Sequence, residues 1–162
     1  MHWHGKAAEE NMQARMTSIA VLIPDALKAL IAFSASAKNA GVPETTANLV
    51  HLRASQINGC SVCTEMHSLE MRKAGEGDER VFAVAAWRDS PYFTGAERAA
   101  LALAEAATRL ADRPDPVPDE VWNEAAKHYD ERALACLLIE IAAINAFNRL
   151  SVPTRQPSGR TY

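Results

Sequence analysis

The sequence is poor in the residues that interrupt regular structure, with only 7 Gly and 8 Pro among 162 residues. A fold of many short strands would need more turn residues than this, so an all-β architecture is disfavoured. Basic residues also form no cluster: 17 Lys and Arg stand against 20 Asp and Glu, for a formal charge of −3. We therefore expect no nucleic-acid partner.

Long apolar runs are missing as well. The run over residues 17–23 ends at Pro24, and the apolar stretch that begins at Ala133 contains Glu140. Both fall short of the roughly 20 apolar residues that span a bilayer, so we expect no membrane segment. Charged residues precede the first apolar run, which is unlike a secretory signal. Three cysteines are too few for a disulfide framework, and a cytoplasmic location is the default expectation.

What the sequence does contain is a succession of helical segments joined by short loops. Thr94 and Glu97 form a capping box, which predicts the start of a helix. The predicted helices span residues 12–21, 25–40, 43–57, 60–75, 79–87, 96–111, 119–128 and 131–150. No alternating pattern typical of a strand persists. We predict an all-α single domain, with a core over about residues 12–150 and a loose polar tail over 151–162.

The last predicted helix is apolar around much of its circumference, through Leu134, Leu137, Leu138, Ile141 and Ile144. Such a helix lies in the centre of a core or at a subunit interface. The sequence therefore favours a homo-oligomer.

The feature that best indicates a reactive site is the Cys-x-x-Cys motif of Cys60 and Cys63, with His67 four residues further on. On a helix these spacings place the three side chains on one face. The motif also stands at a predicted helix N-terminus, where free N–H groups and the helix dipole favour an anion. A thiolate there has a lowered pKa and is the reactive form. His67 can take a proton from the neighbouring sulfur or give one to a leaving oxygen.

Two other interpretations of the cysteines stay open at this point. They can be small buried apolar residues, since free cysteine packs well in cores. They can also bind zinc, with His51 completing a Cys₂His₂ set. A structural zinc site needs four ligands, however, and the sequence has no second Cys-x-x-Cys. Both interpretations are less favoured than redox chemistry.

Residues 52–67, which contain the cysteines and His67, resemble the core of the carboxymuconolactone decarboxylase superfamily in its AhpD-like branch. Segments at 72–75, 85–88, 99–106 and 144–150 are similar to the same branch. The resemblance implies an AhpD-like helical fold and homo-oligomers, commonly trimers or hexamers. It also implies thiol-dependent reduction of hydroperoxides or of partner disulfides, with no cofactor or metal.

The same resemblance assigns roles to the three residues. Cys63 would meet the peroxide and become a sulfenic acid, Cys60 would resolve it, and His67 would be the relay histidine. The helix start alone favours Cys60 as the nucleophile, whereas the spacing to His67 favours Cys63. We follow the family.

One position departs from the family pattern. Its well-studied peroxidases carry a relay glutamate twelve residues before the first cysteine, and that position is Asn48 here. Asparagine cannot titrate. Glu44 and His51 share its helix face and could substitute, although a solvated polar stripe explains them equally well. We therefore predict weaker peroxide reduction than in members with the full relay, with thiol–disulfide exchange retained.

The leading hypothesis is thus an antioxidant thiol oxidoreductase that acts on a hydroperoxide and is restored by a dithiol reductant or a redox partner protein. The alternatives are a decarboxylase of muconolactone-like acids, which would not need the cysteine pair, and a redox-sensing oligomer without turnover.

Overall fold

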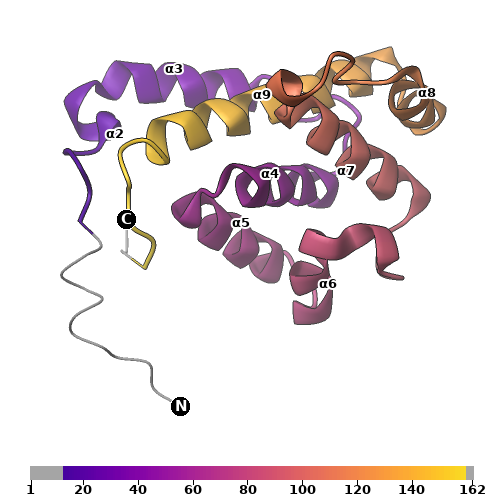
Figure 1. The fold of residues 1–162 in the computed structure, drawn as a ribbon, viewed down its shortest axis with the longest axis horizontal. Coiled ribbons are helices and arrows are strands. Elements are labelled where there is room, and N and C mark those ends of the chain that lie inside the picture. The colour runs from indigo at the N-terminus through magenta and orange to yellow at the C-terminus, as the bar shows by residue number, and fades with distance from the viewer. Residues whose placement is uncertain (1–12, 160–162) are drawn as a thin grey trace.

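The computed structural model describes residues 13–159, and over this part of the chain the regular structure is entirely helical (Figure 1). This confirms the predicted all-α fold. The helices in chain order are α2 (Ile19–Leu22), α3 (Pro24–Ala35), α4 (Glu44–Asn58), α5 (Ser61–Lys73), α6 (Asp78–Ala83), the 3-10 turn η1 (Val84–Asp89), α7 (Gly95–Thr108), the 3-10 turn η2 (Leu110–Asp112), α8 (Asp119–His128) and α9 (Glu131–Ser151).

Three predicted helices differ from the observed ones. The first is shorter than predicted, because the Ser18 side chain caps α2 at Ala20 and the Arg15 amide binds the Thr154 carbonyl instead of a helical partner. The second ends at Ala35, and the following turn reaches Gly41 at φ +99°. The helix predicted over 79–87 is observed as α6 followed by η1, and Ala86 inside η1 has non-helical backbone angles.

Helix α4 lies in the middle of the molecule, with α5 on one side, α7 on the other, and α9 across it (Figure 1). Its side chains Leu49, Val50 and Leu52 are fully buried. Val50 packs with Leu137 and Ile141 of α9, while Leu49 and Leu52 pack with residues of α5, α6 and η1. The residues of the predicted site therefore lie on α4, in the middle of the molecule, and on its neighbour α5.

The long helix α9 is explained by burial. By length and composition it could cross a bilayer, and it is the one such helix within residues 13–159. However, 56% of its apolar window is buried against the rest of the chain. It contacts α3, α4, α5, α7 and α8, which confirms the prediction of a central helix.

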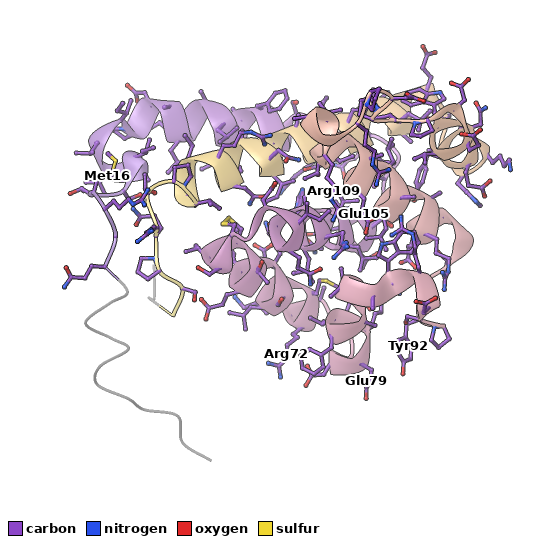
Figure 2. All side chains as sticks on the ribbon, in the orientation of Figure 1. Met16, Arg72, Glu79, Tyr92, Glu105 and Arg109 are labelled. Atoms are coloured by element: carbon purple, nitrogen blue, oxygen red, sulfur yellow. A yellow bond between two sulfur atoms is a disulfide. The ribbon has the colours of Figure 1, made fainter. Side chains whose placement is uncertain are left out.

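A buried carboxylate ties α4 and η1 to α7. Glu105 accepts hydrogen bonds from Arg53 Nε at 2.6 Å, from Trp87 Nε1 at 2.9 Å and from an Arg88 guanidinium nitrogen at 2.6 Å. Burial acts to raise the pKa of this carboxyl group, but the three donors outweigh it and the pKa is lowered. Figure 2 shows Glu105 inside the helical framework with Arg109 beside it. This network fixes the orientation of α4, whose opposite face points toward α5 and α9.

Helix α3 is apolar but buries none of its residues within the chain. Ile31 is 52% exposed and Phe33 is 43% exposed, and the neighbouring Val21 and Ile23 are more exposed still. Homo-oligomer formation, which would cover such a face, stays a prediction.

Candidate active site

The turn before the cysteines is set by an amide network. Gly59 ends α4 in the left-handed conformation at φ +69°, as predicted for the Asn-Gly pair. The Asn58 side-chain amide donates to Asn145 Oδ1 and to Asn148 Oδ1 of α9, both at 2.9 Å. Because this turn is anchored to α9, the next residue, Cys60, is held at the start of α5.

Cys60 and Cys63 are joined by a disulfide bond, with their Cα atoms 5.4 Å apart. Cys60 is the N-cap of α5, and the backbone amide of Cys63 donates to Cys60 Sγ at 3.3 Å. The two residues are only 2% and 3% exposed. The pair therefore stands at the helix N-terminus that the sequence predicts, where the backbone favours the negative charge of a thiolate.

His67 lies one turn after Cys63 and is buried, with 6% of its surface exposed. Its Nδ1 atom is 2.8 Å from Glu70 Oε2. Burial lowers the pKa of His67 more than the Glu70 hydrogen bond raises it, and the nearby His51 lowers it further. The same hydrogen bond lowers the pKa of Glu70, so the carboxylate accepts a proton-bearing Nδ1–H.

The other ring nitrogen of His67 is free. Nε2 is buried and has no hydrogen-bond partner among residues 13–159. In a neutral ring with the proton on Nδ1, Nε2 carries a lone pair and acts as an acceptor. A buried acceptor without a partner is costly, and such groups concentrate at functional sites. Nε2 of His67 is thus available to accept a proton.

A second histidine faces the first. The rings of His51 and His67 lie 4.8 Å apart between their centroids, tilted by 48°. His51 Nε2 is 2.9 Å from Glu140 Oε2, and Ser34 Oγ donates to the same carboxylate oxygen at 3.3 Å. Glu140 is buried in α9. Each histidine therefore has its own carboxylate, Glu70 for His67 and Glu140 for His51.

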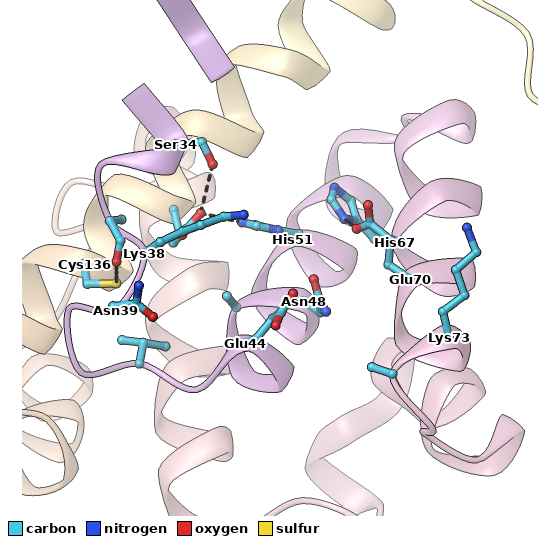
Figure 3. A pocket seen from close by; sticks show the side chains of 15 residues that line it. Ser34, Lys38, Asn39, Glu44, Asn48, His51, His67, Glu70, Lys73 and Cys136 are labelled. Atoms are coloured by element: carbon cyan, nitrogen blue, oxygen red, sulfur yellow. Dashed lines mark hydrogen bonds and ion pairs between the residues drawn. The ribbon is translucent and has the colours of Figure 1, made fainter. Parts of the chain in front are cut away.

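These groups line one cavity of about 650 Å³ between α3, α4, α5 and α9. Figure 3 shows His51 and Asn48 of α4 between the Glu70 side of α5 and Ser34 of α3. Two lysines, Lys38 and Lys73, also line the cavity, whereas neither Cys60 nor Cys63 does. The volume is within the range of small-molecule sites. His67 lines this cavity, and Cys63 precedes it by one turn of α5.

The structure brings the predicted polar residues together. Glu44, Asn48 and His51 line the same cavity as His67, and Asn48 is buried there. Sequence reasoning missed Glu70 and Glu140. Glu70 stands three residues after His67, a spacing that places both on one helix face. Glu140 is an isolated acid in the apolar residues of α9, and a charge in such a run needs a buried partner.

The structure also shows the surroundings of the third cysteine, Cys136, and bears on the zinc hypothesis. Cys136 is buried, as predicted, and its Sγ donates to the Ala37 carbonyl at 3.1 Å. Burial raises the pKa of this thiol, which disfavours a reactive thiolate. The zinc hypothesis required Cys60, Cys63 and His51 to converge. Instead, the two sulfurs are bonded to each other and His51 binds Glu140.

Comparison with known proteins agrees with this arrangement. The model of the carboxymuconolactone decarboxylase family matches residues 24–106, which include both cysteines and His67. The chain belongs to the carboxymuconolactone decarboxylase family. The uncharacterised protein YdfG of Bacillus subtilis is 34% identical over 131 residues, covering 81% of this chain and 88% of YdfG. The uncharacterised protein YnjA of Escherichia coli is 34% identical over 104 residues, covering 64% of this chain and 53% of YnjA.

Solved structures place the chain in the AhpD-like branch of the family. A protein of unknown function from Agrobacterium tumefaciens, described as a candidate antioxidant defence protein AhpD, superposes with a TM-score of 0.85. It is 31% identical, and the match covers 92% of this chain and all of that one. The debrominase Bmp8 superposes with a TM-score of 0.72 at 24% identity, covering 83% of this chain and 72% of its own. The likeness to Bmp8 shows the shared fold alone.

Proposed function

We propose that this protein is a thiol-dependent antioxidant oxidoreductase that reduces hydroperoxides at Cys63 and is restored by a dithiol. The observation that carries the proposal is the pairing of a disulfide at a helix N-terminus with a buried histidine whose Nε2 is free. Membership of the AhpD-like branch supports the same chemistry. Every group that the reaction needs is a side chain of this chain.

The reaction begins from the reduced pair. His67 Nε2 accepts the Cys63 proton, and the thiolate attacks the terminal, hydrogen-bearing oxygen of ROOH. An S–O bond forms while the O–O bond breaks, so that Cys63 becomes a sulfenic acid and the electron pair leaves with RO⁻. The alkoxide takes a proton and departs as ROH. Cys60 then displaces water from the sulfenic acid, which gives the disulfide seen in the structure.

His51 is the proton donor for the departing oxygen in this proposal. It lines the cavity beside His67, and its Nε2 lies 2.9 Å from a carboxylate oxygen of Glu140. The carboxylate that the family pattern places at position 48 would thus come from α9 in this chain. Asn48 lies in the same cavity, where its amide can hydrogen-bond the peroxide but cannot supply a proton through titration.

The direct test is stoichiometric. The fully reduced protein is mixed with one equivalent of an alkyl hydroperoxide, and the free thiols and the alcohol product are both measured. We expect two thiols to be lost for each molecule of alcohol formed, and we expect turnover when a dithiol is supplied in excess. Unchanged thiols after mixing would refute peroxide reduction by this chain.

The role of Glu140 gives a separate prediction. Glu140→Gln keeps a hydrogen-bond acceptor for His51 but removes the charge, and a charge-assisted hydrogen bond is worth about 1.5–3 kcal/mol. We expect the oxidation of the thiols by hydroperoxide to slow by about 10-fold to 100-fold. Reduction of the disulfide by a dithiol should change little, because no oxygen departs in that half of the cycle.

Glu44→Gln is the matched control, since Glu44 lines the same cavity from an exposed position at the start of α4. It should leave both half-reactions near their original rates. If Glu44→Gln stopped peroxide reduction while Glu140→Gln did not, the proton would enter along α4, and the role assigned to Glu140 would be wrong.

A further inference from the structure

A second cavity reaches the disulfide from another side. It has a volume of about 300 Å³ and is lined by Cys60 and Ser61 at the start of α5 and by residues of the C-terminal segment 151–158. The first cavity contains His67 but neither cysteine, whereas this one contains Cys60 but not His67. Cys60 therefore faces the second cavity, whereas Cys63 lines neither cavity and is followed one helical turn later by His67, which lines the first.

The C-terminal segment that walls the second cavity is held in place by hydrogen bonds. The Arg15 amide donates to the Thr154 carbonyl at 2.9 Å, and the Gln156 side chain donates to the Met16 carbonyl at 3.2 Å. The Gly159 amide donates to the Glu65 carboxylate at 2.6 Å. The wall beside Cys60 is thus a fixed part of the fold, although it contains no helix beyond the end of α9.

The charges of the two cavities differ. Three carboxylates line the first cavity, those of Glu44, Glu70 and Glu140, against the two lysines. Among the described residues that line the second cavity, Arg155 is the one charged side chain, and it is exposed. It also lies at the N-terminus of α5, where free N–H groups add positive potential. An incoming thiolate is repelled by carboxylates and attracted by such a site.

We propose that the second cavity is the entry site of the reductant, a small anionic dithiol, and that one of its thiolates attacks Cys60 rather than Cys63. This inference rests on the proposed function, because it assigns the second half of that cycle to a separate site. The peroxide would bind in the first cavity, which His67 lines, and the reductant in the second cavity, which Arg155 lines. The two half-reactions would then not compete for one cavity.

The chemistry of this step balances without any other reactant. The thiolate of the reductant forms a new S–S bond with Cys60 Sγ, and the electron pair of the old disulfide leaves on Cys63. That leaving thiolate sits in the first turn of α5, where the helix N-terminus stabilises it and speeds its departure. A second thiol then attacks the reductant sulfur of the mixed disulfide, which releases Cys60 as a thiolate and the reductant as a disulfide.

The test starts from the disulfide form and uses two small thiols of opposite charge, 2-mercaptoethanesulfonate and cysteamine. The mixed disulfide is trapped with acid, and fragmentation of the tryptic peptide 54–72, which contains both cysteines, locates it. We expect it on Cys60. Arg155→Gln should slow reduction by the sulfonate about two- to fivefold, the usual range for an exposed charge, and should not slow reduction by cysteamine. Arg155→Lys should restore the rate.

Two tryptophan substitutions, one at each cavity, provide a matched pair of variants. Ser158→Trp at the second cavity should slow disulfide reduction by both thiols and leave peroxide oxidation of the reduced protein unchanged. Ala74→Trp at the first cavity should do the reverse. A mixed disulfide on Cys63, or reduction that is unaffected by Ser158→Trp, would overturn the assignment. Because reduction is followed without any peroxide, these outcomes are independent of whether the chain reduces hydroperoxides.

Discussion

Replacing Cys63 with serine should abolish hydroperoxide reduction, because the thiolate that attacks the peroxide is removed and serine is not ionised near neutral pH. Loss of the nucleophile leaves no residual route through Cys60, which lines the other cavity and is not four residues from His67. The measurement is turnover of an alkyl hydroperoxide with excess dithiol. The variant should be folded, since serine is smaller than cysteine and the site lies at a helix start.

Cys136→Ser is the control for this substitution. Cys136 is also buried and lines the first cavity, and a serine hydroxyl can make the same hydrogen bond to the Ala37 carbonyl. Its turnover should match that of the unsubstituted chain. Cys60→Ser should behave differently from both: one equivalent of peroxide is consumed, and a sulfenic acid then persists on Cys63.

The same variants separate the proposed function from its alternatives. A muconolactone-type decarboxylase would keep its activity after Cys63→Ser, because that reaction does not use the cysteine pair. A redox-sensing oligomer would show no turnover to lose, and only the dependence of its assembly on reduction would change. Peroxide turnover that survives in Cys63→Ser would contradict the mechanism directly.

The helices could be predicted from the sequence wherever their signals are local. The capping box of Thr94 and Glu97 forms as predicted, and the left-handed Gly59 ends α4. The errors arose where distant contacts compete with local propensity. Arg15 and Met16 bond to the C-terminal segment instead of lying in a helix, and no spacing within residues 12–21 indicates that partner.

In the candidate site, too, contacts within one helix could be predicted from the sequence and contacts between helices could not. Cys60, Cys63 and His67 lie on one short helix, so their spacing was sufficient to place them together. The pairing of His51 with Glu140 joins residues 89 positions apart, and that of Ser34 with Glu140 joins residues 106 apart. Single-sequence patterns report contacts along one helix face and not contacts between α4 and α9. An isolated acid in an apolar run, such as Glu140, requires a buried partner, but the sequence does not identify that partner.

Replacing His67 should also cause a large loss in the rate of reaction with hydroperoxide. Replacing His67 with alanine removes the base that accepts the Cys63 proton, and positioned acid–base groups contribute about 10²-fold to 10⁴-fold to such reactions. We expect the rate at which hydroperoxide oxidises the reduced protein to fall by that factor near neutral pH. His128→Ala is the control, because His128 is exposed on α8 and contacts Glu124 rather than the cavity. It should leave the rate unchanged.

The pH dependence of the same reaction shows whether His67 acts as this base. Because burial lowers the pKa of His67, its ring stays neutral, and able to accept a proton, to a pH below the usual histidine value of about 6.5. The rate should therefore hold as the pH falls toward that value and decline only below it, as His67 becomes protonated. In His67→Ala the rate should instead follow the ionisation of the Cys63 thiol alone, and its decline should begin at a higher pH because no base remains to accept the proton. Stopped-flow measurements of thiol oxidation over the range of about pH 5 to 8 would resolve the two profiles. An identical acid limb in both proteins would assign the titration to another group and remove His67 from the proton transfer.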